Sequence, residues 1–199
     1  MHRAARNCLA LVALTLLAAC ASNRFAADVT RFHLTPSVAR GSVFLVPMDP
    51  AAAGTLEFQS YASAVAAELG KVGFAVTDQR AAAELIGVVG AGQTTREGPP
   101  KSSPVSIGVG GGTFGRNVGI GVGTTFGVGK PKSSDIALNT LQLRLRRASD
   151  ATVIWEGRAV AEAAMTSRYG PLASAVPALA NALLRDFPGK SGQTVRVNL

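Results

Sequence analysis

Two neighbouring segments, residues 138–147 and 152–162, constrain the fold more than any other feature of this sequence. In the first segment, leucines share one face of an alternating pattern and polar residues share the other: Leu141, Leu143 and Leu145 against Thr140, Gln142, Arg144 and Arg146. A period of two residues is that of a β-strand with one buried face and one wet face. The segment therefore predicts a strand of an antiparallel sheet whose second face meets solvent.

The second segment predicts the partner strand of a hairpin. One face carries Val153, Trp155, Gly157 and Ala159, and the other carries Glu156, Arg158 and Glu162, with Asp150 marking the turn. Cross-strand partners must lie on the same face, so Leu145 should oppose Trp155 while Arg144 opposes Glu156 across a loop of odd length. We expect Trp155 to be a core residue rather than a platform for a ligand.

The N-terminal half predicts a strand, a helix and two further strands. Residues 42–47 (SVFLVP) are rich in β-formers and stop at Pro47, and Phe32 and Leu34 are candidates for a preceding strand. An amphipathic helix is predicted from apolar residues at helical spacing, with Glu57 in its first turn, ending at Gly70 and Gly73; those apolar residues are Phe58, Tyr61, Val65, Leu69 and Val72. Residues 74–77 and 84–90 predict two strands.

A second amphipathic helix is predicted near the C-terminus, before Pro188-Gly189. Its apolar residues are Leu172, Val176, Leu179, Leu183 and Phe187. Because Pro177 lacks an amide hydrogen, we expect the regular helix either to start near Ser174 or to kink at the proline. The chain as a whole predicts one small α+β domain in which a mostly antiparallel sheet is packed by two helices.

A glycine-rich insert separates the two halves of this domain. Residues 105–129 hold ten glycines and a single charge, Arg116, and residues 107–115 (IGVGGGTFG) return in shortened form as 120–127 (IGVGTTFG). Prolines bracket the insert, which extends over about residues 99–131. Ten glycines would cost a helix roughly 8 to 10 kcal/mol relative to alanine, whereas alternation of Ile or Val with Gly suits an extended chain.

Three conformations of the insert remain open from the sequence. A β-hairpin that turns near Arg116-Asn117 is the first choice, and a disordered loop is another. A membrane glycine zipper is the third, because glycines recur every four residues from Gly111 to Gly127. In each case the apolar side chains of the insert are candidates for contact with a partner or with lipid: Val105, Ile107, Phe114, Ile120, Val122 and Phe126.

The N-terminus predicts a lipid anchor. Arg3 and Arg6 precede an apolar run that is too short to span a bilayer, and the run ends in Leu17-Ala18-Ala19-Cys20, which resembles the bacterial lipobox. Residues 1–19 would be a lipoprotein signal peptide, residues 20–30 a lipidated tether, and residues 31–199 the domain. The absence of Asp after Cys20 resembles lipoproteins sorted to the outer membrane, with the domain facing the periplasm.

Composition limits the chemistry of the mature chain. It would carry 18 basic and 12 acidic residues, a formal charge of +6, with Arg144 and Arg146 as a candidate basic face for anionic envelope polymers. Cys8 leaves with the signal peptide and Cys20 is lipidated, so no disulfide is expected. With His33 as the single remaining histidine, we predict no metal site, no cofactor, no nucleic-acid binding and no enzymatic activity.

Several of these motifs together resemble a known family. They are residues 69–74 (LGKVGF), 83–86 (AELI) and 150–157 (DATVIWEG), together with the helix that ends in Phe187-Pro188. The chain resembles, loosely over residues 31–188, the bacterial lipoprotein family of the domain of unknown function numbered forty-one thirty-six (DUF4136), although Glu84 stands where the family suggests aspartate. The resemblance implies a small α+β domain, usually with a glycine-rich middle, and implies no catalytic residues.

These observations lead to an expected function. The chain should be an outer-membrane lipoprotein that acts as a non-catalytic binding or scaffolding module, with envelope proteins or anionic polymers as partners. The alternative is an accessory lipoprotein of a lipid or envelope transport system. A membrane-inserting glycine-zipper protein and a hydrolase are weaker alternatives.

Overall fold

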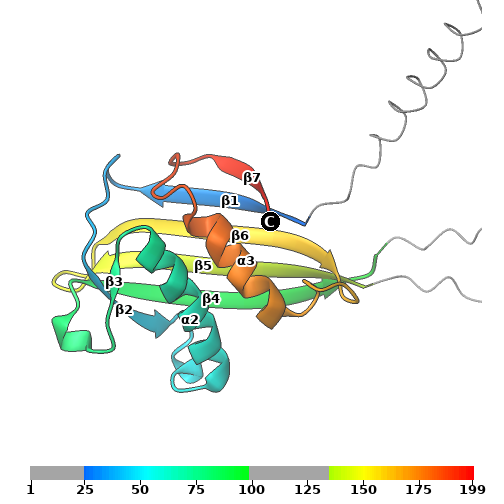
Figure 1. Cartoon of the computed structure of the whole chain (residues 1–199), viewed down its shortest axis with the longest axis horizontal. Coiled ribbons are helices and arrows are strands. Elements are labelled where there is room, and N and C mark those ends of the chain that lie inside the picture. The colour runs from blue at the N-terminus through cyan, green and yellow to red at the C-terminus, as the bar shows by residue number, and fades with distance from the viewer. Residues whose placement is uncertain (1–24, 99–134) are drawn as a thin grey trace, which may run out of the picture.

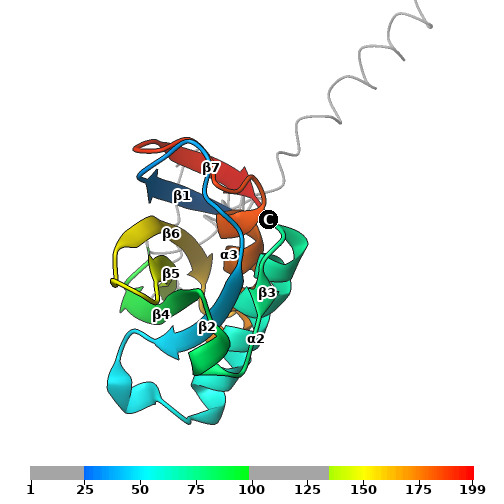
Figure 2. The same cartoon turned by 90° about the vertical axis from the view of Figure 1, so that its left-hand side faces the viewer.

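Seven strands form one sheet in the order β3-β2-β4-β5-β6-β1-β7, and two helices cover one face of it (Figures 1 and 2). The computed structural model describes residues 25–98 and 135–199. The strands are β1 (Ala26–His33), β2 (Ser42–Pro47), β3 (Ala75–Val76), β4 (Leu85–Arg96), β5 (Ile136–Arg147), β6 (Val153–Ala164) and β7 (Thr194–Asn198). The helices are α2 (Leu56–Lys71) and α3 (Leu172–Leu184), with short 3-10 helices η2 (Pro50–Ala52) and η3 (Arg80–Ala82). The predicted α+β class is confirmed.

Most neighbouring strands are antiparallel, but β2 runs parallel to both β3 and β4. Parallel strands need a long crossover connection between them. Helix α2 provides it, because it carries the chain from the end of β2 back to the side of the sheet where both β2 and β3 begin. We call the face covered by the helices the inner face and the opposite one the outer face. Leu141, Leu143 and Leu145 are buried on the inner face, as their alternation predicts.

The hairpin of β5 and β6 has the predicted register up to its last pairs. Arg144 opposes Glu156 and Leu145 opposes Trp155. A bulge at Ile154 then shifts the pairing, so that Val153 opposes Arg146. Val153 therefore does not share a face with Trp155, so that prediction is wrong, whereas the connection of residues 148–152 between the two strands has the predicted odd length. One extra residue in a strand reverses the parity of everything beyond it.

The N-terminal boundary of the domain is also corrected. The sequence assigned residues 20–30 to a tether, yet β1 begins at Ala26 and lies between β6 and β7. Ala27 and Val29 are fully buried within this strand. Strands β6 and β7 occupy both edges of β1, and α3 packs on its inner face, so small side chains are buried there without the alternation of bulky apolar residues that predicts a strand from sequence.

Both helices turn the predicted apolar residues toward the core. Six of these residues are buried and four are partly buried: Tyr61, Val65, Leu69, Val176, Leu179 and Leu183, and then Phe58, Val72, Leu172 and Phe187. The Thr55 hydroxyl caps α2 by accepting from the Phe58 amide at 3.2 Å, and Gly73, with φ +94°, follows the end of the helix. Helix α3 begins at Leu172 and runs through Pro177, so the predicted start near Ser174 lies two residues too late.

Trp155 lies at the centre of the core, where it is completely buried. Its ring packs 5.2 Å from that of Phe187, and its Nε1–H donates to the Pro188 carbonyl at 3.0 Å. Gly157 leaves the room for the ring, because a Cβ at that position would lie 2.6 Å from it. The prediction that Trp155 is a core residue is confirmed.

Arg31 is a buried charge that caps the end of α3. Its guanidinium donates to the carbonyls of Leu183 and Ala182 at 2.9 and 2.8 Å. Burial lowers the pKa of Arg31, and the charge of Asp186 opposes that shift. A cation at a helix C-terminus satisfies carbonyls that lack an intrahelical partner, so this contact joins β1 to α3.

The start of β1, the end of β4 and the start of β5 lie at one end of the sheet. Arg96 opposes Ile136, Ile136 opposes Ala164, and Ala27 opposes Ala161 near the end of β6. In Figure 1 these strand ends are all at the right. The N-terminal segment before residue 25 and both ends of the insert, at residues 98 and 135, therefore adjoin the same end of the domain.

Candidate functional site

One edge of β4 is left without a neighbouring strand over half of its length. Strand β2 accompanies β4 from Leu85 to Val89 and stops at Pro47, whereas β4 continues to Arg96. We call Gly90–Arg96 the open edge. The described residues contribute no strand beside it on the side opposite β5.

The direction of the backbone groups on the open edge follows from one hydrogen bond. The Met48 amide donates to the Val89 carbonyl at 2.8 Å, so Val89 directs its backbone groups toward the β2 side. These directions alternate along a strand, and the amides and carbonyls of Ala91, Gln93 and Thr95 therefore also point to that side. Those of Gly92 and Thr94 point to β5.

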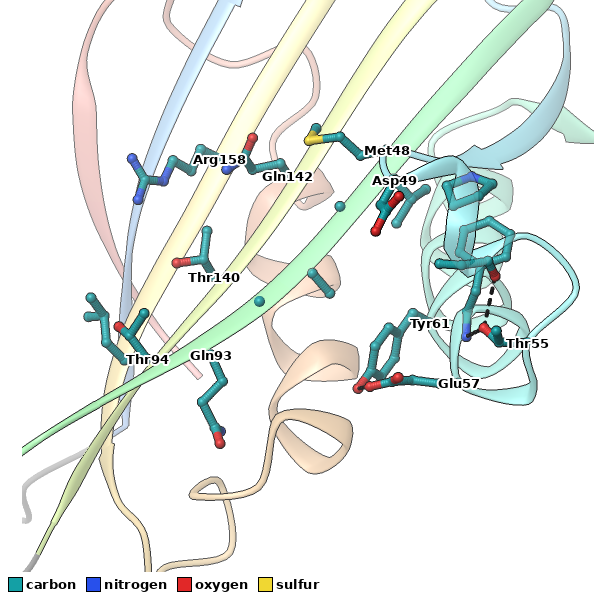
Figure 3. Close-up of a pocket in the computed structure, with 18 residues that line it drawn as sticks. Met48, Asp49, Thr55, Glu57, Tyr61, Gln93, Thr94, Thr140, Gln142 and Arg158 are labelled. Atoms are coloured by element: carbon teal, nitrogen blue, oxygen red, sulfur yellow. Dashed lines mark hydrogen bonds between the residues drawn. The ribbon is translucent and has the colours of Figure 1, made fainter.

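A cleft of about 460 Å³ wraps around this edge. On the inner side it is lined by Phe58 and Tyr61 of α2, and on the outer side by Thr140, Gln142 and Arg158. The connection from Pro47 to Thr55 closes one end. Figure 3 shows Tyr61 and Glu57 on one side of the β4 ribbon and Thr140, Gln142 and Arg158 on the other. The cleft thus combines an apolar wall, a polar wall and backbone hydrogen-bonding groups.

Tyr61 and Glu57 form a pair at the inner wall. The Tyr61 hydroxyl donates to Glu57 Oε1 at 2.7 Å, one helical turn away. Burial, together with the hydrogen bond to Glu57 and its charge, raises the pKa of Tyr61 to about 12. The phenol therefore stays protonated at neutral pH and serves as a hydrogen-bond donor, not as a base.

Arg158, like Arg146, lacks within the described residues the carboxylate partner that three other arginines of the outer face have. Arg144 pairs with Glu156 at 3.3 Å, Arg96 with Glu162 at 2.7 Å and Arg196 with Asp28 at 3.4 Å. Arg158 has no carboxylate within 4.0 Å among residues 25–98 and 135–199. It lines both the cleft and an adjoining hollow of about 320 Å³, where Phe32 is 49% exposed. An anionic or carbonyl group bound there would meet an uncompensated cation.

The two predicted basic residues share the outer face but have different surroundings. Arg144 is half-exposed and paired with Glu156. Arg146 is partly buried at the far end of the sheet, where it lines a third hollow with Arg80 and Arg147. Its Nε is buried without a hydrogen-bond partner in the described part of the chain. The structure thus places both residues on the predicted face, and an interaction of that face with anionic polymers stays a prediction.

The other predicted site residues lie outside the described residues. These are Cys20 and the insert residues Val105, Ile107, Phe114, Ile120, Val122 and Phe126. Among residues 25–98 and 135–199, no cluster of three or more His, Cys, Asp or Glu side chains could hold a metal ion. In the same ranges, no helix has both the length and the apolar composition to cross a bilayer.

Sequence reasoning missed the open edge, although a signal for it exists. Pro47 ends β2 after six residues, while the polar and glycine-rich segment 90–96 continues β4 without an apolar pattern. Gly90 is part of the same arrangement, because Met48 packs over it and a Cβ there would lie 3.0 Å from the Met48 sulfur. A short strand beside a longer one in the sheet indicates that part of the longer strand's edge is unpaired.

Comparisons with known proteins find a family, a relative and solved structures of distant similarity. The family described as a domain of unknown function (DUF4136) matches residues 26–189. An uncharacterized protein of Zymomonas mobilis is 31% identical over 211 residues, which cover 85% of this chain and 79% of the relative. Among solved structures, a PDZ domain protein from Parabacteroides distasonis has a TM-score of 0.48 and 13% identity over 87% of this chain, which spans 38% of that protein. A PelC dodecamer from Paraburkholderia phytofirmans has a TM-score of 0.40 and 14% identity, covering 84% and 99% of the two chains.

Proposed function

We propose that this protein, which belongs to the DUF4136 family, is a non-catalytic binding or scaffolding module held at the outer membrane by lipid on Cys20. The residues Leu17-Ala18-Ala19-Cys20 support the anchor, because small residues before a cysteine suit lipoprotein processing. Several acyl chains on one cysteine would hold the domain durably at the membrane, on its periplasmic side.

The observation that carries this proposal is that the tether and the insert join the domain at the same end of the sheet. The chain enters β1 at Ala26, six residues after Cys20, a span of at most about 20 Å when fully extended. Residues 98 and 135, where the insert leaves and rejoins the sheet, lie at that same end. A lipid anchor on Cys20 would therefore hold the insert close to the membrane surface, within reach of membrane-bound partners.

The cleft supports a binding role in the same place. The open edge is the half of β4 that ends at Arg96, so it belongs to the end of the sheet nearest the proposed anchor. Its backbone groups and the apolar wall at Phe58 and Tyr61 suit an added strand of polypeptide, and Arg158, which has no carboxylate partner among the described residues, lies beside that strand on the outer face and could meet an anionic partner.

Acylation is tested by replacing each cysteine of the precursor in turn. Cys20→Ser should abolish incorporation of labelled palmitate and leave the precursor uncleaved by the lipoprotein peptidase. Cys8→Ser is the matched control and should incorporate palmitate like the parent, because Cys8 lies within the signal peptide. Continued labelling of Cys20→Ser would refute the anchor.

The binding role is tested by deleting residues 105–129 from the acylated protein. The variant should fold and keep its lipid, but lose the envelope partners that copurify after crosslinking in intact cells. A folded variant that keeps every partner would refute a role of the insert in binding. If the captured partners are components of a transporter, the alternative function as a transport accessory lipoprotein replaces the scaffold.

A further inference from the structure

We propose that the open edge of β4 is covered by the beginning of the glycine-rich insert, with residues 105–109 forming an eighth strand antiparallel to residues 91–95. The proposal does not depend on lipidation of Cys20. It names the occupant of the cleft and assigns different roles to the two copies of the repeat.

The backbone of the open edge calls for a partner. Ala91, Gln93 and Thr95 direct three amides and three carbonyls away from β5, and no backbone group of the described residues meets them. Water can solvate such an edge, but exposed edges also pair with other chains, and proteins commonly cover them. A strand in the cleft would satisfy these groups and would continue the line of β2 beyond Pro47.

The side chains around the edge match the alternation of the insert. Odd-numbered residues of β4 face the inner side, where Phe58 and Tyr61 of α2 form an apolar wall and Gln93 donates to the Gly170 carbonyl before α3, while Gly90 and Gly92 face outward. In the insert, Val105, Ile107 and Val109 alternate with Ser106, Gly108 and Gly110. If Ile107 opposes Gln93, all three branched side chains face the apolar wall and the small residues face outward.

The connection between β4 and the proposed strand is short. The chain leaves β4 at Arg96, and residues 97–104 would form the turn that brings residue 105 beside Thr95. Pro99, Pro100 and Pro104 fall in this turn, where they cost no hydrogen bond of the sheet. A segment tethered this closely has a high effective concentration at the edge, which favours it over a free partner strand.

Amide hydrogen exchange, measured by NMR on the full mature protein in detergent micelles, tests the proposal residue by residue. The amides of Ala91, Gln93 and Thr95 should be protected in the parent and should exchange at least about 100-fold faster after deletion of residues 105–129. The amides of Gly92 and Thr94 are internal controls, because they point to β5 and should stay protected in both proteins.

A pair of proline variants tests which copy of the repeat covers the edge. In the proposed register the Ile107 amide points to β4, so Ile107→Pro should expose the three edge amides in the same way as the deletion. Ile120→Pro, at the equivalent position of the second copy, should leave them protected.

Four results would overturn the proposal. The edge amides could exchange freely in the parent, or they could stay protected after the deletion. Protection that appears only as protein concentration rises would identify a second copy of the chain as the occupant. Exposure by Ile120→Pro but not by Ile107→Pro would assign the edge to the second copy of the repeat.

Discussion

Replacement of Trp155 by alanine should destabilise the domain by about 3 to 5 kcal/mol. The side chain is completely buried between the sheet and α3, so its removal leaves a cavity bounded by Phe187 and Leu183. The Pro188 carbonyl also loses its donor, which accounts for about 1 kcal/mol of that cost. Gly157 cannot fill the space, because it has no side chain to move.

Urea unfolding followed by far-UV circular dichroism measures this effect, since the variant lacks the chain's single tryptophan and its fluorescence. Trp155→Phe should cost less, about 1 to 2 kcal/mol, because it keeps an aromatic ring against Phe187 and loses the indole N–H. Ile154→Val is a control at the bulge and should cost about 1 kcal/mol. A loss below about 1 kcal/mol for Trp155→Ala would refute the view that this ring organises the core.

Two further predictions concern buried polar groups. Arg31→Met keeps much of the side-chain volume but removes both hydrogen bonds to the end of α3, and it should lower the free energy of unfolding by about 2 to 4 kcal/mol in urea. Arg196→Met removes an exposed pair and should change it by less than about 1 kcal/mol; equal losses in the two variants would contradict the capping role. Tyr61 has a pKa of about 12 in the folded protein against about 10 when unfolded, so its neutral phenol contributes stability that is complete below about pH 10 and is lost as pH rises toward 12. The urea midpoint should therefore fall more steeply above pH 10 in the parent than in Tyr61→Phe, and parallel curves would contradict the raised pKa.

The sequence predicts the β5–β6 hairpin well because most of its residues can face only one side of the sheet. Leucines alternate with polar residues on β5, and the pairing of Leu145 with Trp155 follows from that alternation together with the turn marked by Asp150. The bulge at Ile154 could not be predicted in the same way, because Val153 and Ile154 are both β-branched and either can face the core. The local pattern thus specifies which face of the sheet each residue takes, while tertiary packing decides where a bulge leaves one residue out of the strand pairing.

The strands that the sequence did not predict are held by pairing with neighbouring strands rather than by a row of bulky apolar side chains. In β1, which β6 and β7 hold at both edges, the small residues Ala27 and Val29 are buried on the inner face, and β7 itself contributes Val197 as its single buried residue. The extension of β4 beyond Gly90 has mostly small or polar residues and is held by pairing with β5. Pairing of this kind leaves a weak trace in hydrophobic periodicity.

The open edge and the proposed anchor point to the same half of the sheet, and this coincidence makes the insert's role testable in two separable ways. Deleting residues 105–129 removes the binding segment and also uncovers the β4 edge, so a loss of partners could reflect either change. Ile107→Pro separates them, because it should uncover the edge while the second copy of the repeat, with Ile120 and Phe126, stays in the chain. If partners bind the second copy, Ile107→Pro should keep them in the crosslinking assay even though its edge amides exchange rapidly. Loss of partners in Ile107→Pro would instead show that they require the completed eight-stranded sheet.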